Sequence, residues 1–187
     1  MLSILELPSV RRQAVPIDIR TYHWMASQGL IAERTELLRG VIVEKMSKSP
    51  LHSAVARMLL EICQAAVDAN HFVTKEDPLT LADSEPEPDI AIISGNIHDF
   101  RDSHPTSAVL VIEVAVSSVE LDREKAFLYA EANIPEYWLV LPESRTLEIF
   151  SEPASGAYQR HQSLNAGEVA TSASMPNLQV QLDQLFG

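Results

Sequence analysis

One apolar stretch, Val109-Leu110-Val111-Ile112-Glu113-Val114-Ala115-Val116, most limits what this chain can fold into. The stretch is short, rich in β-branched residues and free of glycine and proline, so it predicts a strand that is buried on both faces. Such a strand needs packed layers on both sides of its sheet. Glu113 interrupts the stretch, and a carboxylate that loses its hydration there must be offset by a cation, a metal ion or a changed pKa.

The elements around this strand predict an α/β fold with a mixed central β-sheet flanked by helices. A helix from Ser117 or Ser118 to about Ala132, followed by a strand over 137–141, would form a right-handed parallel crossover with it. Shorter connections elsewhere suit antiparallel pairs. The other expected elements are helices over about 18–28 and 51–70, strands over 35–46 (bent at Gly40), 72–81 and 89–93, and short strands or turns over 147–150, 158–162 and 178–182.

The length of the chain bounds its domain organisation. With 187 residues, of which 46% are hydrophobic and 21% charged, it suits one globular domain with a real core. We expect a single domain over 1–187, with a loose N-terminal tail over 1–15, additional N-terminal helix and strands, a core over about 35–141 and a strand-rich C-terminal extension over about 142–187. No apolar run approaches membrane-spanning length and no basic-then-apolar leader opens the chain, so we expect no membrane association.

The charge of the chain limits how it can meet nucleic acid. Lys and Arg total 14 and Asp and Glu total 26, which gives a net charge of −12. This charge repels phosphate backbones at long range and argues against indiscriminate tight binding, but it leaves room for a local basic groove. Lys45, Lys48 and Arg57, or Arg123 and Lys125, are candidates for such a groove. For Lys45 and Lys48 the simpler interpretation is scattered, solvated side chains.

The single cysteine indicates the compartment. Cys63 falls among the apolar positions of the helix expected over 51–70, which predicts a small core residue. One cysteine excludes both a disulfide within the chain and a cluster of thiolate metal ligands. A reducing cytoplasm is therefore the expected location.

Two acidic residues and a lysine form the candidate site. Asp89 opens one strand and Glu113 stands near the end of the next, so antiparallel pairing would bring their carboxylates together. Mg²⁺ prefers a few carboxylate oxygens plus waters, which can act as the nucleophile or touch a phosphate. Lys125, on the helix that follows Glu113, would orient the attacking water or neutralise charge in the transition state.

Four further residues extend this candidate site. Asp122 and Tyr129 lie three and four residues from Lys125, which puts all three on one helix face. Glu36 is as misplaced among apolar neighbours as Glu113 and is a candidate third carboxylate. His52, at the start of a helix, is a candidate contact to a phosphate or to a metal-bound water.

Structural interpretations of these residues stay open. Glu113 and Lys125 can form a buried ion pair without catalysis. Asp122 suits the first turn of a helix because of the helix dipole. A histidine at a helix start is often a cap or a surface group, and Pro-Asp is a common way to begin a strand.

Taken in order, these residues resemble the Uma-two family of restriction endonucleases, within the PD-(D/E)XK nuclease superfamily. The resemblance covers about Asp18 to Leu185. It rests on Glu36-Leu37-Leu38-Arg39-Gly40-Val41-Ile42, His52, Pro88-Asp89-Ile90-Ala91-Ile92-Ile93, Val111-Ile112-Glu113-Val114-Ala115-Val116-Ser117, Asp122-Arg123-Glu124-Lys125, Tyr129 and Ile134-Pro135-Glu136-Tyr137-Trp138-Leu139-Val140.

The resemblance implies a restriction-endonuclease-like core that binds Mg²⁺ or Mn²⁺ and cleaves phosphodiester bonds, usually in DNA. Asp89 matches the motif aspartate and Glu113 the motif acid, which makes both the implied metal ligands. The superfamily lysine would fall at position 115, where this chain has Ala115, and the resemblance assigns its role to Lys125. Asn133 departs from the family in a smaller way, since many members have glycine there.

We therefore expect an endonuclease that hydrolyses DNA by a metal-activated water and acts as a homodimer. Asp89, Glu113, Lys125 and Glu36 form the expected catalytic group, and His52, Asp122 and Tyr129 are expected to bind the substrate. The alternative is a catalytically inactive module of the same fold that acts as a dimeric binding or regulatory protein, as the charge of −12 and the missing lysine at 115 suggest. A hydrolase of small phosphorylated molecules would need a closed pocket instead of an open groove.

Overall fold

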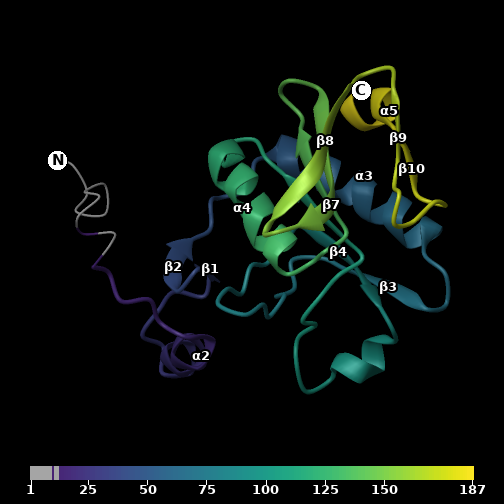
Figure 1. Ribbon diagram of the computed structural model, residues 1–187. Helices are drawn as coiled ribbons and strands as arrows, with labels where there is room; N and C mark the ends of the chain where they lie inside the picture. The colour runs from purple at the N-terminus through teal and green to yellow at the C-terminus, as the bar shows by residue number, and fades with distance from the viewer. Residues whose placement is uncertain (1–9, 11–12) are drawn as a thin grey trace. The chain divides into compact units, whose positions relative to one another are not determined.

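The computed structural model describes residue 10 and residues 13–187 (Figure 1). The described chain forms two compact units. One contains the residues up to Lys45 together with 83–85, and the other contains 46–82 and 86–187. The loose tail expected over 1–15 falls mostly on residues 1–9 and 11–12, which lie outside the described residues, and the single domain over 1–187 stays a prediction.

The first unit begins with a capped helix. Helix α2 (Ile19–Ser27) starts at Asp18, whose Oδ1 accepts a hydrogen bond from the Thr21 backbone N–H at 2.7 Å. This bond satisfies one of the amide groups that the first turn leaves without an intrahelical acceptor. The expected helix over 18–28 is confirmed, and Gly29 follows it with φ of +65°.

A tight hairpin follows in the same unit. Strands β1 (Thr35–Leu38) and β2 (Val41–Glu44) pair antiparallel, with Leu38 opposite Val41. Gly40 lies in the turn with φ of +73°, and a Cβ added there would come within 2.3 Å of the Pro16 Cβ. Both the backbone conformation and the close approach require glycine, so the predicted bend at Gly40 is confirmed.

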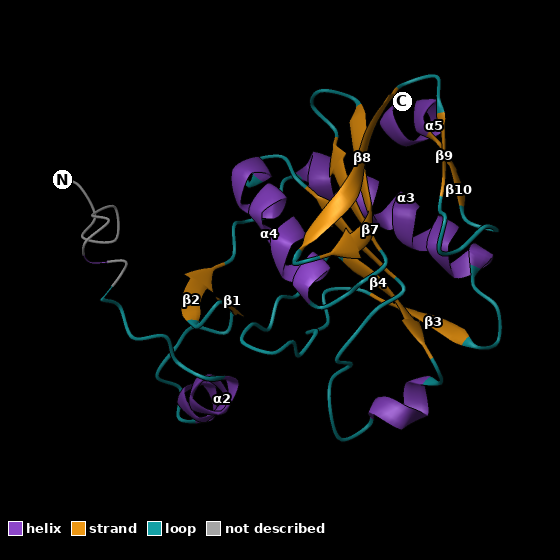
Figure 2. Cartoon of the chain, in the orientation of Figure 1, coloured by secondary structure: helices purple, strands orange, loops and turns teal. Residues whose placement is uncertain are grey.

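A six-stranded mixed sheet forms the centre of the second unit (Figure 2). Its spatial order is β3 (His71–Thr74), β4 (Ile90–Ser94), β5 (Leu110–Val114), β6 (Glu136–Leu141), β7 (Thr146–Ala154) and β8 (Ala157–Asn165). Strands β5 and β6 run parallel and the other neighbours in this sheet run antiparallel. The α/β fold with a mixed central sheet, including the parallel crossover, is confirmed.

Helices cover both faces of this sheet. Helix α3 (Pro50–Ala66) packs on one face and helix α4 (Val119–Glu131) on the other. The strands supply alternate residues to the two cores: Ile90, Ile92, Leu110, Ile112 and Trp138 meet α3, whereas Ala91, Val111, Tyr137 and Leu139 meet α4. Because both faces are covered, β5 is buried along its whole length and, apart from Glu113, apolar instead of alternating. Cys63 is fully buried in the α3 core, as predicted.

Several element boundaries differ from the predictions. The strand expected over 72–81 ends at Thr74, because the polar residues beyond it bend away, with Glu76 at φ of +59°, and Pro78 cannot donate to a ladder. Helix α3 ends at Ala66, where the extended backbone of Val67 stops it before the expected residue 70. A short 3₁₀ helix, η2 (Ile97–Phe100), lies within the loop expected over 94–107.

The C-terminal part differs most from its prediction. Strands β7 and β8, nine residues each, extend the central sheet, whereas short strands or turns were expected over 147–150 and 158–162. Strands β9 (Val169–Thr171) and β10 (Gln179–Gln181) form a separate two-stranded sheet. Helix α5 (Leu182–Phe186), where the sequence suggested a strand end, completes the chain. Across residues 13–187, no helix is both apolar enough and long enough for a membrane crossing.

A buried carboxylate ties this C-terminal segment to the sheet. Glu136 of β6 is 1% exposed and accepts hydrogen bonds from Trp138 Nε1 at 2.7 Å, Ser172 Oγ at 2.6 Å and the Ser174 backbone N–H at 3.0 Å. These donors satisfy an acid that would otherwise be costly to bury.

Replacement of Ser172 by alanine should therefore destabilise the fold. The variant loses a hydrogen bond to a buried acid, and we expect the free energy of unfolding to fall by about 2 kcal/mol in urea titrations. Ser174→Ala is the matched control, because its contact to Glu136 comes from the backbone. An equal loss in both variants would show that the Ser172 hydroxyl has no special role.

Candidate active site

Antiparallel pairing of β4 and β5 places the start of one strand beside the end of the other. Ile90 lies opposite Ile112, so Asp89, which precedes β4, comes beside Glu113. The Asp89 backbone N–H donates to Glu113 Oε2 at 3.1 Å, and the Val114 backbone N–H donates to Asp89 Oδ2 at 2.8 Å. Each carboxylate is thus held by the backbone of the neighbouring strand, and the two predicted metal ligands lie together at one end of the strand pair.

Two side chains hold Asp89 as an anion, one from just before helix α3 and one from its first turn. Lys48 Nζ donates to its Oδ1 at 2.8 Å, and His52 Nε2 lies 3.0 Å from its Oδ2. Burial by itself would raise the pKa of Asp89, but the hydrogen bond and charge of His52, with the charge of Lys48, lower it to about 2. His52 is fixed in turn because its backbone N–H donates to the Ser49 side chain at the start of α3.

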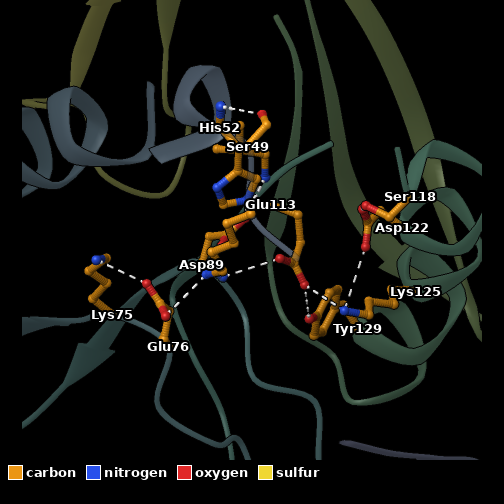
Figure 3. Close-up of polar contacts among 12 residues, drawn as sticks. Ser49, His52, Lys75, Glu76, Asp89, Glu113, Ser118, Asp122, Lys125 and Tyr129 are labelled. Carbon is orange, nitrogen blue, oxygen red and sulfur yellow. Dashed lines mark hydrogen bonds and ion pairs between the residues drawn. The ribbon is translucent and has the colours of Figure 1, made fainter. Parts of the chain in front are cut away.

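Glu113 is bound from the opposite side by helix α4 (Figure 3). Its Oε1 accepts hydrogen bonds from Lys125 Nζ at 3.0 Å and from the Tyr129 hydroxyl at 3.2 Å. Lys125 also lies 3.5 Å from Asp122 Oδ1, and the Ser118 hydroxyl donates to the other oxygen of Asp122. The helix face predicted from the spacing of 122, 125 and 129 is therefore present, and all three side chains are buried.

Lys48 is the residue that the sequence interpretation missed. It was expected to be solvated, but its side chain is 35% exposed and contacts Asp89 Oδ1 and, at 3.1 Å, Glu76 Oε2. Glu76 also pairs with Lys75 at 2.9 Å. Burial by itself would lower the pKa of Lys48. The negative charge of Asp89 and the hydrogen bond to it outweigh burial and raise this pKa. No local signal marks this contact, because Lys48 and Asp89 are 41 residues apart.

Glu36 and Arg123 are the remaining candidates. Glu36 is in β1 of the first unit, opposite Val43, and its membership of the site stays a prediction. Arg123 does not join Lys125 in a basic groove, because its guanidinium binds Glu148 at 2.5 and 3.3 Å. It faces the β7–β8 hairpin, whereas Lys125 faces Glu113.

The donor set suits a hard divalent cation. Among residues 13–187 no group of three or more His, Cys, Asp or Glu side chains is arranged to hold a metal ion, so the pair Asp89 and Glu113 would supply two ligands. Mg²⁺ is commonly bound by one or two carboxylates and completes its shell with waters and substrate phosphates. The backbone amides that orient both carboxylates would fix these ligands as outer-shell groups do in metal sites.

Comparisons with known proteins identify the family and the fold. The model of the Uma2 (Uma-two) family, described as "Putative restriction endonuclease", matches residues 28–183. The chain belongs to the Uma2 family. A crystal structure of a "putative nuclease belonging to DUF820" from Anabaena variabilis is similar to this Uma2 chain with a TM-score of 0.75 and 16% sequence identity, covering 91% of this chain and 98% of that chain. At that identity the likeness establishes a shared nuclease-like fold. The comparison with curated proteins gave no match.

The lowered pKa of Asp89 predicts how the stability of this Uma2 chain depends on pH. The pKa falls from an ordinary value of 3.8 to about 2, so the ionised side chain stabilises the fold above about pH 4. This contribution is lost as the pH falls from about 4 through 2. In EDTA, the free energy of unfolding should therefore drop by about 2 kcal/mol more in the wild type than in Asp89→Asn over this range. Urea titrations at each pH would measure it, and parallel curves would contradict it.

Proposed function

We propose that this protein is a divalent-metal-dependent endonuclease that hydrolyses phosphodiester bonds in DNA. The observation that carries the proposal is the pairing of Asp89 with Glu113 at the end of β4 and β5, with Lys125 bound to Glu113 at 3.0 Å. Membership of the Uma2 family and the nuclease-like fold support it. Mg²⁺ or Mn²⁺ is the proposed cofactor.

The side chains divide the chemistry between them. A bound divalent cation would supply an activated water and a Lewis acid for the phosphate oxygens. Asp89 and Glu113 provide the hard oxygen ligands, and the backbone N–H groups of Asp89 and Val114 keep those ligands aligned. Lys125 donates a hydrogen bond to Glu113 and would bring a fixed positive charge toward the charge that develops on the phosphate.

Three predicted substrate-binding residues are better proposed as positioning groups. His52 holds Asp89, and Tyr129 holds Glu113 through the same oxygen that Lys125 binds. Asp122 holds the ammonium of Lys125. Each of these side chains contacts a proposed catalytic residue directly, so its effect on the substrate would pass through that residue. Glu36 stays a candidate third carboxylate.

The proposed assembly follows from the substrate, and the proposed location follows from the single cysteine. Cleavage of both strands of a duplex needs two sites, and a symmetric homodimer would present them in opposite orientations, so we propose a homodimer. Because the net charge is −12, its affinity for DNA would come from local contacts and metal ions and not from long-range electrostatic attraction. The reduced, buried Cys63 fits a cytoplasmic protein.

A non-catalytic module of this fold is the second candidate. It is favoured because each carboxylate already forms an ion pair within the protein. Lys48 pairs with Asp89, and Lys125 pairs with Glu113. A structural ion-pair network of this kind needs no metal. Calorimetry with Mn²⁺ separates the two candidates, because a module would take up no cation at millimolar concentration.

Plasmid cleavage tests the proposed function. Purified protein should convert supercoiled plasmid to open-circular or linear DNA with Mg²⁺ or Mn²⁺ and should leave it intact with EDTA. The same reactions on a small phosphodiester such as bis(p-nitrophenyl) phosphate test the remaining alternative. Turnover of the small ester with intact plasmid would point to a hydrolase of small molecules, and no metal-dependent turnover of either would overturn the proposal.

A further inference from the structure

Two lysines contact the proposed metal ligands, and they differ in how a substrate can reach them. The Lys125 side chain is 6% exposed and lies between Glu113 and Asp122. The Lys48 side chain is 35% exposed and extends from the segment just before α3. A phosphate arriving from solvent can therefore meet Lys48 without any rearrangement of the core, whereas Lys125 is enclosed by protein.

Lys48 also occupies the oxygen of Asp89 that a cation would use. Oδ2 of Asp89 already accepts the Val114 backbone N–H and contacts His52 Nε2, which fills both of its lone-pair directions. Oδ1 is the remaining oxygen, and the Lys48 ammonium lies 2.8 Å from it. A divalent cation that binds Oδ1 would have to displace this ammonium or share the oxygen with it at short range.

Glu76 gives the displaced ammonium a second anchor. Its Oε2 lies 3.1 Å from Lys48 Nζ, so Lys48 is held by two acids at once. When Lys48 leaves Asp89, its contact with Glu76 would keep the ammonium close to the site. Lysine suits such a movement because its charge sits on a flexible four-carbon stem.

We propose that Lys48 is a second active-site lysine, which neutralises Asp89 in the cation-free protein and binds the substrate phosphate once a divalent cation has taken its place. This inference rests on the proposed function. It assigns the contact with the scissile region of DNA to the exposed lysine and leaves Lys125 as the buried partner of Glu113.

Lys48→Met tests this assignment because it removes the charge and keeps most of the stem. Without the competing ammonium, Mn²⁺ should bind about 3–10-fold more tightly, as measured by calorimetry without DNA. Affinity for a short duplex, measured by fluorescence anisotropy in Ca²⁺ with the duplex checked for integrity, should fall about 3–10-fold, and the salt slope should decrease by about one phosphate contact. Lys48→Arg should keep the affinity for DNA.

Lys75→Met is the matched control. It removes an equal charge from a lysine that, like Lys48, pairs with Glu76. The contact with Asp89 is made by Lys48 and stays in place in this control. Both affinities should stay within about twofold of the wild type, as expected for an exposed ion pair.

The two affinities of Lys48→Met must move in opposite directions. A structural role would weaken both, and this result would overturn the assignment while the proposed function stands. Equal behaviour of Lys48→Met and Lys75→Met would overturn it as well. If wild-type protein itself takes up no Mn²⁺, the proposed function fails first, and the assignment fails with it.

Discussion

Replacement of Asp89 by asparagine is expected to lower metal-dependent cleavage of DNA by at least about 10²–10³-fold. The variant keeps the shape of the side chain but removes the negative charge that a divalent cation needs. It also leaves the Val114 N–H and His52 with one carboxylate oxygen fewer to bind. Rates of plasmid nicking under single-turnover conditions, at a temperature where circular dichroism shows the variant folded, would measure the loss.

Glu148→Gln provides the control for this experiment. Glu148 is also a buried acid in an ion pair, with Arg123 at 2.5 Å, but it lies on β7 and contacts neither Asp89 nor Glu113 in the structure. Its loss should leave cleavage near the wild-type rate. If Asp89→Asn and Glu148→Gln cleave DNA equally well, Asp89 has no part in the chemistry.

Lys125→Met is expected to cost about 3–5 kcal/mol of stability. The substitution leaves Glu113 and Asp122 buried without the ammonium that lies 3.0 and 3.5 Å from their oxygens. Urea titration in EDTA would measure the loss of unfolding free energy. Addition of Mn²⁺ should restore part of it and should raise the melting temperature more in Lys125→Met than in the wild type, since the cation would supply the missing charge.

The double variant Lys125→Met/Glu113→Gln completes this test. Removal of both charges should recover most of the stability that Lys125→Met alone loses, because the buried negative charge of Glu113 is then removed together with the ammonium. A cost below about 1 kcal/mol for Lys125→Met would mean that the pair contributes no more than an exposed ion pair, contrary to its burial.

The centre of this site could be predicted from the sequence because it depends on short-range patterns. The apolar run around Glu113 fixes a doubly covered strand, and the helix and strand after it can complete only a right-handed crossover. Antiparallel pairing with the strand that Asp89 opens then brings the two acids together. The spacing of 122, 125 and 129 along one helix directs their side chains to the same place.

The rest depends on contacts that no local pattern encodes. Lys48 reaches Asp89 across 41 residues, and His52 reaches it across 37, so neither contact follows from spacing along a helix or strand. Strand β8 is mostly exposed and polar, with residues such as Gln159 and Arg160, and it lacks the alternation that would mark a nine-residue strand. This strand lies at the edge of the sheet and is held there by its pairing with β7. The residue pattern of β8 alone does not reveal that pairing.

Diffraction from a crystal soaked in Mn²⁺ tests the central claim most directly. If Asp89 and Glu113 share a divalent cation, an anomalous peak will lie about 2.1 Å from a carboxylate oxygen of each, with Lys48 moved away from Asp89 Oδ1. No peak between the two carboxylates at millimolar Mn²⁺, with Lys48 and Lys125 still bound to them, would contradict it.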